Sequence, residues 1–279
     1  MREYPDVSIT FACYNQVEYT RQCIESMQRT HTPLHRVVAV DNASSDSTLP
    51  YLESLPLGRV IHNANNLGCG VAWNQGALEQ QAEWTIVMNN DVIVGESWVE
   101  GLINAAVQHK LDIVSPAMIE GELDYDFPAF ATKAREKMGN VMRIGWAHAV
   151  CLAVHRRVWQ EIGYFRANPK LLGYEDAIFF QDAQQAGLRI GVTGASWLHH
   201  FGSITQSAMK QERGLQQKSD LGNRSYNLSQ LRQSFIKRKL NKFRLMRMKR
   251  HWHDQEIEEH GMALWGRSQN GQIIWRRDR

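Results

Sequence analysis

The sequence predicts an α/β fold: a mostly parallel sheet flanked by helices, with a basic helical extension at its C-terminal end. Short apolar runs alternate with amphipathic stretches through about the first two hundred residues, which is typical of strands joined by helical crossovers. Polar residues follow directly after the apolar runs. Basic residues concentrate after Lys210, although the net charge of the whole chain is only +3. We therefore expect a main domain over residues 1–207 and a basic, mainly helical extension over residues 208–279.

The elements of the main domain can be predicted in order from the period of their apolar residues. Apolar runs of four to seven residues predict buried strands, and longer amphipathic stretches predict helices. Ser44–Thr48 supplies side chains that can cap a helix, Asp46 among them. The predicted strands are Val7–Cys13, Arg36–Val40, Arg59–His62 and Thr85–Met88, and the predicted helices are Gln16–Arg29 and Cys69–Gln80.

The composition excludes several classes of protein. A chain of 279 residues with 43% hydrophobic residues can bury a large core. No stretch reaches the roughly 18 apolar residues that span a bilayer, and the N-terminus lacks the pattern of a secretory signal. The four cysteines show no CxxC spacing. We therefore expect a soluble, cytoplasmic protein with reduced thiols.

The residues after the first two strands are candidates for binding a nucleotide, because ligands of parallel sheets sit at the carboxyl ends of the strands. Tyr14 and Asn15 follow the first strand, and Asp41 ends the second. A carboxylate there can accept hydrogen bonds from a nucleobase or a ribose, although an ordinary turn aspartate has the same pattern. No GxGxxG follows the first strand, which argues against a dinucleotide-dependent oxidoreductase.

A second candidate segment is Asn65-Asn66-Leu67-Gly68-Cys69-Gly70, with Asn74 one helical turn further on. Glycine at a helix start lets the backbone approach phosphate or ribose, and the free N–H groups favour anions. A plain junction between a loop and a helix has a similar sequence.

A third candidate segment, Asn89-Asn90-Asp91, follows the fourth strand. A carboxylate at a strand end suits a hard cation such as Mn²⁺ or Mg²⁺ bridging a diphosphate. One carboxylate is a sparse site, so another ligand is expected from elsewhere in the chain.

Taken together, these segments resemble glycosyltransferase family 2, whose members have the GT-A fold, and especially its branch with many rhamnosyltransferases. The resemblance runs from about Val7 to about Ser203. It is carried, in order, by VSITFACYN, VVAVDNASSDST, NNLGCGVAWNQG, VMNNDV, GYEDAIFFQDAQQAGLRI and WLHHFGS. It implies a GT-A catalytic domain over residues 1–207, with a Rossmann-like sheet.

The resemblance also implies roles for individual residues. Asp176, with Glu175, matches the general base. Asp91 matches the last position of the DxD metal motif, whose first position is Asn89 here, so the motif is incomplete. His199 or His200 matches the histidine that joins the metal, with His199 the first choice. The donor nucleotide would contact Tyr14, Asn15, Asp41, Asn66, Gly68, Asn74, Asn89 and Asn90.

The chain departs from the family pattern on the expected acceptor side. Arg166-Ala167 follows Gly163-Tyr164-Phe165 where an FDE-like run is common, and Ile178 replaces a further acidic residue. The QxxRW signature of processive synthases is absent, which favours transfer of one sugar. We expect Trp146 to lie near the acceptor.

These observations predict an inverting transferase that moves a sugar from a dTDP- or UDP-sugar to a hydroxyl of a cell-surface glycan or glycolipid precursor. One alternative is a non-catalytic nucleotide- or glycan-binding protein that keeps the fold. A nucleotidyltransferase is another, but the glycine-rich, lysine-containing loop expected after its first strand is missing.

Two segments remain. Glu120–Asn140 lacks clear periodicity and is interpreted as a loop, either a lid over the site or a surface excursion. Lys237–Arg250 is rich in basic residues and carries an apolar stripe at helical spacing. It suits an interfacial helix on anionic lipid at the inner face of the plasma membrane, or equally a helix that packs on the catalytic domain. Nucleic acid is the least favoured partner. The stripe consists of Ile236, Leu240, Phe243 and Met246.

Overall fold

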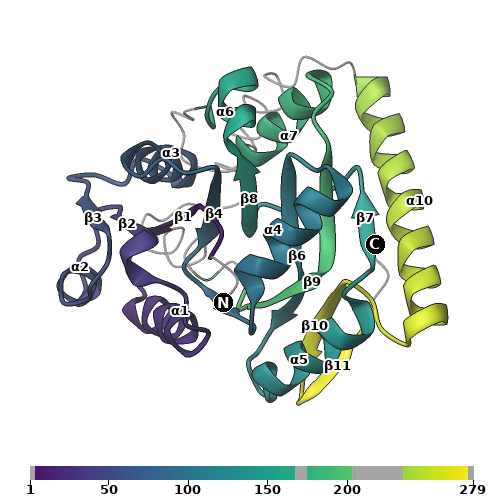
Figure 1. Cartoon of the computed structure of the whole chain (residues 1–279), viewed down its shortest axis with the longest axis horizontal. Coiled ribbons are helices and arrows are strands. Elements are labelled where there is room, and N and C mark those ends of the chain that lie inside the picture. The colour runs from purple at the N-terminus through teal and green to yellow at the C-terminus, as the bar shows by residue number, and fades with distance from the viewer. Residues whose placement is uncertain (1–3, 167–174, 203, 205–234, 276–279) are drawn as a thin grey trace.

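A computed structural model describes residues 4–166, 175–202, 204 and 235–275 of the chain. Figure 1 shows one curled sheet with helices on both faces, and the long helix α10 along one side. The strands are β1 Val7–Cys13, β2 Val37–Asp41, β3 Arg59–His62, β4 Trp84–Asn89, β5 Val92–Val94, β6 Ile113–Gly121, β7 Met142–Ile144, β8 Cys151–His155, β9 Ile190–His200, β10 Trp265–Gln269 and β11 Gln272–Ile274. The helices are α1 Val17–Arg29, the 3-10 turn η1 Leu34–Arg36, α2 Thr48–Glu53, α3 Cys69–Glu79, α4 Trp98–His109, α5 Phe127–Met138, α6 Arg156–Ile162, α7 Glu175–Gln185 and α10 Phe235–His260.

The first half of the sheet is parallel, in the order β4-β1-β2-β3. Because side chains alternate along a strand, Ile86 and Met88 of β4 pack with α1 and α4, whereas Val87 packs on the other face with α3, α6 and α7. Helix α3 lies close against β1. A Cβ atom at Gly76 would come within 1.8 Å of the Thr10 hydroxyl oxygen. The carboxyl ends of β1, β2 and β4 thus open on a common edge of the sheet.

The α/β class predicted from the sequence is confirmed, and the second half of the sheet makes it mixed. Strand β8 is antiparallel to both β4 and β6, whereas β9 runs parallel to β6. The short strands β5 and β7 pair antiparallel with β9. Strand β9 therefore brings its last residues, His199 and His200, beside the segment that follows β4.

The interpretation of Glu120–Asn140 as a loop is wrong. Strand β6 continues to Gly121, and α5 fills Phe127–Met138. Asp126 caps this helix, because its carboxylate accepts a hydrogen bond from the backbone N–H of Ala129 at 3.0 Å. The buried face of α5 packs on β9, so most of this segment belongs to the folded core. Its buried residues are Phe127, Ala131, Ala134 and Met138.

The C-terminal part of the chain joins the same sheet. Strand β10 pairs in parallel with β6, and the β10–β11 hairpin forms one end of the strand order. Met262 and Leu264 are buried in the cluster that also contains Trp197. The expected boundary between residues 207 and 208 lies outside the described residues, so the division into two domains stays a prediction.

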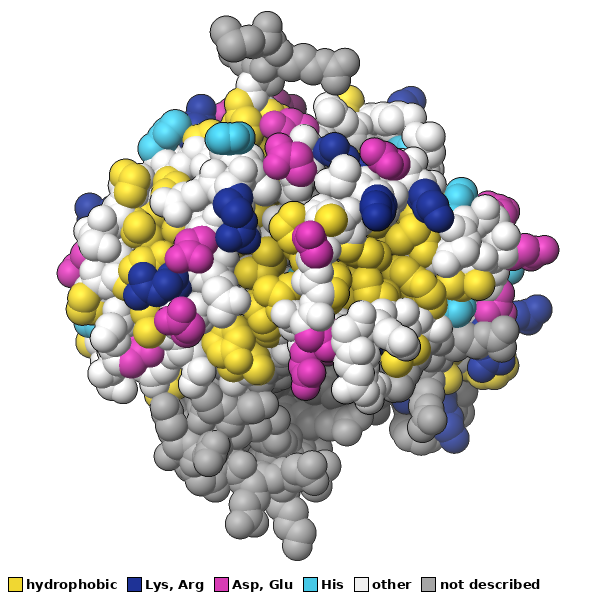
Figure 2. Space-filling view, turned by 90° about the horizontal axis from the view of Figure 1, so that it is seen from below, with side chains coloured by type: hydrophobic (Ala, Val, Ile, Leu, Met, Phe, Trp, Pro, Cys, Tyr) yellow, Lys and Arg dark blue, Asp and Glu magenta, His cyan; other side chains and the backbone are white. Residues whose placement is uncertain are grey.

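Among the described residues on the face opposite α7, side chains of both charges occur (Figure 2). Figure 2 shows acidic and basic side chains interspersed among apolar ones on this side. In the described part of the chain, no helix combines the length and the hydrophobicity that a bilayer crossing requires.

Candidate active site

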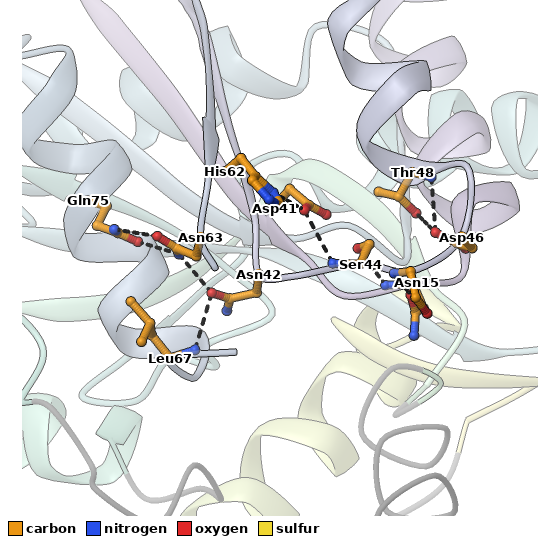
Figure 3. Close-up of polar contacts among 11 residues, drawn as sticks. Asn15, Asp41, Asn42, Ser44, Asp46, Thr48, His62, Asn63, Leu67 and Gln75 are labelled. Atoms are coloured by element: carbon orange, nitrogen blue, oxygen red, sulfur yellow. Dashed lines mark hydrogen bonds and ion pairs between the residues drawn. The ribbon is translucent and has the colours of Figure 1, made fainter. Parts of the chain in front are cut away.

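Asp41, the last residue of β2, is fully buried. Its Oδ2 accepts hydrogen bonds from the backbone N–H of Ser44 at 3.2 Å and from Nδ1 of His62 at 2.8 Å (Figure 3). Its Oδ1 is buried and has no hydrogen-bond partner among the described residues. Since a buried carboxylate oxygen is costly to leave unpaired, Asp41 is prepared for a donor group from a ligand.

The loops after β1 and β2 are tied together at Asn15. The backbone N–H of Asn15 donates to the Ser44 hydroxyl at 2.8 Å, and Asn15 Oδ1 accepts from the backbone N–H of Ser45 at 2.7 Å (Figure 3). Asp46 accepts from the Thr48 backbone N–H at the start of α2, as expected, and also from the N–H of Val17. These hydrogen bonds hold the loops after β1 and β2 against each other at the edge of the sheet. Tyr14 is half-buried beside them.

The loop before α3 is held by an amide network. Asn63 Nδ2 donates to Asn42 Oδ1 at 2.9 Å, and Asn63 and Gln75 exchange two hydrogen bonds of 2.8 Å. Asn42 Nδ2 in turn donates to the carbonyl of Gly68 at 3.2 Å. Gly68, with a φ of 87°, precedes the first helical residue. The free end of α3 therefore faces the same edge as Asp41, and Asn66 supports it by accepting from the Gly68 N–H at 3.0 Å.

Asn74 and Asn90 each form side-chain hydrogen bonds with a segment that is distant in the sequence. Asn74 Nδ2 donates to the Phe165 carbonyl at 2.7 Å, and its Oδ1 accepts from the Phe165 N–H at 3.0 Å. Asn90 is buried and donates to the Thr20 hydroxyl at 2.8 Å. These hydrogen bonds give both side chains a structural role, and their expected contact with the donor nucleotide stays a prediction. Asn89, at the end of β4, is only partly buried.

Asp91 and His200 form a buried pair. Nε2 of His200 lies 3.4 Å from Oδ1 of Asp91, and their side chains are 9% and 4% exposed. Neither atom has a hydrogen-bond partner in the described chain. Across residues 4–166, 175–202 and 235–275, no three His, Cys, Asp or Glu side chains gather as a complete metal cluster. Oδ1 of Asp91 and Nε2 of His200 suit two ligand positions of a divalent cation whose other ligands come from a diphosphate and water.

His199 points to the other face of β9 and has a different environment. Its Nδ1 lies 3.0 Å from the Tyr125 hydroxyl, and its ring contacts Tyr125, Phe127 and Phe201. Burial lowers the pKa of His199 to about 4, so the ring is neutral. The geometry therefore reverses the first choice made from the sequence: His200, rather than His199, lies beside Asp91.

Glu175 and Asp176 open α7 as a pair of largely buried carboxyl groups. Burial raises the pKa of Glu175 to about 7, and burial also raises the pKa of Asp176. The Cys69 thiol has its pKa raised by burial and then by the charges of Glu175, Asp91 and Asp176. Glu175 lies against the start of α3, where a Cβ atom at Gly70 would come within 3.3 Å of its Cγ. A small pocket there is lined by Leu67, Gly68, Cys69, Gly70, Val71, Arg166 and Glu175.

Trp146 lies on the side of the molecule that faces α10. Nζ of Lys249 sits 4.0 Å from the centre of the Trp146 ring, a cation–π contact. The ring of His148 is 6.0 Å away. Burial lowers the pKa of His148 to about 4, and its Nε2 lies 2.8 Å from the Pro116 carbonyl. Trp146, which we expect to lie near the acceptor, therefore contacts both His148 of the main domain and Lys249 of α10.

Two histidines of this region were missed by reasoning from the sequence. His62 ends β3 just as Asp41 ends β2, so its strand-end position was a signal that could have found it. His148 stands two residues after Trp146 in the sequence, but its buried position depends on contacts with β6 that are distant in sequence.

Comparison with known families gives one match over most of this region. The model of a family described as "Glycosyl transferase family 2" matches residues 8–183. The glycosyltransferase GlyG of Streptococcus pneumoniae is 24% identical over 112 residues, which cover 39% of this chain and 37% of that protein. The succinoglycan biosynthesis protein ExoO of Rhizobium meliloti is 31% identical over 104 residues, 37% of this chain and 30% of that protein. The matched part is thus about a third of each relative's length.

Solved structures share the fold at low sequence identity. GalNAc-T7 with UDP, GalNAc and Mn²⁺ gives a TM-score of 0.58 at 14% identity, covering 72% of this chain and 44% of that one. Staphylococcus aureus TarS with UDP-GlcNAc gives 0.55 at 18%, covering 71% and 61%. The mannosyltransferase PcManGT of Pyrobaculum calidifontis with GDP-Man and Mn²⁺ gives 0.54 at 16%, covering 73% and 59%.

Proposed function

Because this chain belongs to glycosyl transferase family 2, we propose that it moves a single sugar from a nucleotide-diphosphate sugar to an acceptor hydroxyl, with inversion at the anomeric carbon. The observation that carries the proposal is the buried Asp91–His200 pair, whose facing atoms have no hydrogen-bond partner in the described chain, together with Glu175 beside Gly70 at the start of α3. Glu175 and Asp176 are the candidate bases, and the Asp91–His200 pair is the candidate metal site. Sugar transfer needs a base on one side of the reacting carbon and charge compensation on the other.

Asp176 is proposed as the general base. It takes the proton of the acceptor hydroxyl while that oxygen forms its bond to the anomeric carbon. The bond to the donor diphosphate breaks on the opposite side, so the configuration inverts. Burial raises the pKa of Asp176, which makes its carboxylate a stronger base than an exposed aspartate. Glu175, beside it, supports the same pocket.

Asp91 and His200 would hold Mn²⁺ or Mg²⁺, with Asn89 in place of the first carboxylate of the DxD motif. A divalent cation there would offset the negative charge on the diphosphate as it leaves. Two solved relatives of this fold are described with Mn²⁺. Their presence supports a metal in this fold, and the unpaired atoms of Asp91 and His200 support it in this chain.

We propose a dTDP- or UDP-sugar as the donor, bound between Asp41, the Asn15 loop and the start of α3. The dTDP option rests on the resemblance to the branch that contains many rhamnosyltransferases, and the UDP option on relatives described with UDP and UDP-GlcNAc. A thermal-shift screen with UDP, dTDP, GDP and CMP, each with and without Mn²⁺, identifies the donor class. A shift that needs both metal and one nucleotide supports the proposal. The absence of any shift argues for a non-catalytic protein.

The proposed acceptor is a cell-surface glycan or glycolipid precursor, reached at the inner face of the plasma membrane. Leu240 and Phe243, on α10, are 59% and 67% exposed. The basic side chains of Lys239, Lys242 and Arg244 accompany them and are exposed too. Figure 1 shows this N-terminal end of α10 at the same end of the molecule as α7. Apolar side chains among basic ones suit a surface of anionic lipid.

Co-sedimentation with vesicles tests the membrane contact. We expect binding to vesicles rich in phosphatidylglycerol and little binding to pure phosphatidylcholine. Replacing Leu240 and Phe243 by Ser should weaken the binding about tenfold or more. Leu78→Ser is the matched control, because Leu78 is 53% exposed on α3. Equal binding of the control and the double variant would remove α10 from the proposal.

Asp176→Asn tests the transferase proposal itself. Transfer should fall by about 10²–10⁴, because the amide cannot accept the proton, whereas donor binding should survive. Glu161→Gln, an exposed residue of α6, provides the same loss of charge outside the site. Turnover that is unchanged in Asp176→Asn would refute the base assignment.

A further inference from the structure

Asp41 and His62 form a cross-strand pair at the edge of the sheet. They are register partners in the parallel strands β2 and β3, so their side chains share one face. Asp41 is fully buried, and the side chain of His62 is half exposed. His62 therefore connects the buried carboxylate to the surface from which a ligand arrives.

The hydrogen bond between them defines the roles of the two carboxylate oxygens. A carboxylate only accepts hydrogen bonds, so Nδ1 of His62 must carry the proton in their 2.8 Å contact. The Ser44 backbone N–H donates to the same oxygen, Oδ2. Two donors on Oδ2 fix the rotation of the side chain and leave Oδ1, buried and without a partner in the described chain, as the atom a ligand can use.

A second cross-strand pair prevents the strand ends from sliding. Asn42 and Asn63, the next residues along β2 and β3, are joined by a 2.9 Å hydrogen bond, and the Asn63 N–H donates to the Asp41 carbonyl at 2.9 Å. Figure 3 shows the Asp41–His62 and Asn42–Asn63 pairs one after the other at the strand ends. Because the backbone is fixed in this way, the position of Oδ1 depends on the two contacts of Oδ2, with the Ser44 N–H and with the His62 side chain.

We propose that His62 is a positioning residue that sets which nucleobases the donor site accepts. By holding Oδ2, it directs Oδ1 of Asp41 toward a ring N–H of the base. Uracil, thymine and guanine present such an N–H, whereas cytosine and adenine present a lone pair at the matching ring nitrogen. A lone pair against a buried carboxylate oxygen repels and leaves both atoms unpaired, so these bases are rejected. This inference rests on the proposed binding of a nucleotide donor.

Calorimetric titration with matched nucleotides tests the role of His62. The nucleotide that the wild-type protein binds is compared with a matched nucleotide that lacks the ring N–H: UDP with CDP, dTDP with dCDP, or GDP with ADP. Mn²⁺ is present in every titration. We expect the wild-type protein to prefer the base with the N–H by about tenfold or more. In His62→Ala the preference should fall to within about threefold, because affinity for the favoured nucleotide is lost. His62→Gln, whose amide can still donate to Asp41, should recover part of the preference.

Arg59→Ala is the control, since Arg59 lies on the same strand with an exposed side chain. It should leave the preference unchanged. In assays of transfer, His62→Ala should raise the donor KM while kcat stays within about twofold, which a general loss of structure would not do. A wild-type protein that binds none of the nucleotides contradicts the proposed function. A wild-type preference that survives in His62→Ala contradicts only the role of His62.

Discussion

The Glu175 carboxyl group links proton binding to the stability of the fold. Burial raises its pKa from 4.5 to about 7, so the folded state binds this proton more tightly than the unfolded state does. The stabilisation that follows is fully present below about pH 4.5 and is lost as the pH rises through about 7. At neutral pH the candidate active site therefore contains a carboxyl group close to half ionised.

Glu175→Gln should change how stability depends on pH. The neutral amide avoids the cost of a buried charge, so at pH 8 without metal the variant should be more stable than wild type by about 1–3 kcal/mol. At pH 5 the two should unfold alike. Urea unfolding at both pH values measures the difference. Glu161→Gln should follow wild type at both, and a pH-independent effect of Glu175→Gln would contradict the burial argument.

Substitutions of the two histidines at the end of β9 should have different effects on metal binding. His200→Ala should raise the Mn²⁺ concentration needed for the nucleotide thermal shift by about 10–100-fold. His199→Phe should leave that concentration unchanged, since His199 packs among aromatic rings. Titration of Mn²⁺ at saturating nucleotide measures both. The opposite pattern would return the metal role to His199.

Much of the candidate site follows from the sequence because strand ends are local features. Asp41 and Asp91 could be placed at the edge of the sheet from the apolar runs that precede them. The choice between His199 and His200 could not, because it depends on which face of β9 each side chain takes beside β5. The hydrogen bonds of Asn74 and Asn90 could not be predicted either, because their partners, Phe165 and Thr20, are distant in the sequence.

At the scale of elements, strong apolar runs predicted the strands closely, and mixed segments did not. The prediction of β3 matches its bounds, and β2 differs by one residue at each end. Helix α5 was missed although Phe127, Ala131, Ala134 and Met138 recur at helical spacing, because Pro128 and several charged residues hid the pattern. Proline is tolerated in the first helical turn, so Asp126 followed by Pro128 was a start signal.

Helix α10 is fastened to the domain by a buried ion pair. Arg143 of β7 donates two hydrogen bonds of 2.7 Å to Glu256, and the side chains are 3% and 5% exposed. Glu256 also accepts from the backbone N–H of Leu264 at 2.9 Å. The second half of α10 therefore packs on the domain, while its first half exposes Leu240 and Phe243.

Removing one member of this ion pair should cost more than removing both. Arg143→Met leaves the buried charge of Glu256 uncompensated and should destabilise the protein by about 3–5 kcal/mol. Adding Glu256→Gln should recover part of the loss, since the amide oxygen can still accept from Leu264. Denaturant unfolding of the two single variants and the double variant measures the coupling. Strictly additive losses would show that the pair is not coupled.

At the scale of the whole molecule, the C-terminal hairpin completes the sheet that carries the candidate site. Strand β10 pairs with β6, and Ser268 donates to Asp124 at 2.5 Å in the turn that precedes α5. Leu264 is buried against the same layer. These contacts make the C-terminal strands part of the fold that carries the candidate site.

A chain cut after residue 207 should therefore not fold stably. Loss of β10 exposes an edge of β6 and the apolar surface that Met262 and Leu264 cover. We expect poor solubility and a melting temperature at least about 10 °C below that of the full chain. Circular dichroism and thermal melting of the two proteins provide the measurement. A stable, monomeric fragment of residues 1–207 would support an independent catalytic domain instead.

The pairing of β6 with β10 also affects the order in which the protein is made. Residues Met118–Gly121 leave the ribosome long before Trp265–Ser268, their partners. At about 5–20 residues per second, the interval is roughly 7–30 s. During that time the nascent chain exposes the unpaired edge of β6 to other chains that are being translated from the same mRNA. Such edges pair readily with other chains. The edge of β6 is therefore most open to wrong pairing during translation, before the C-terminal strands have been synthesised.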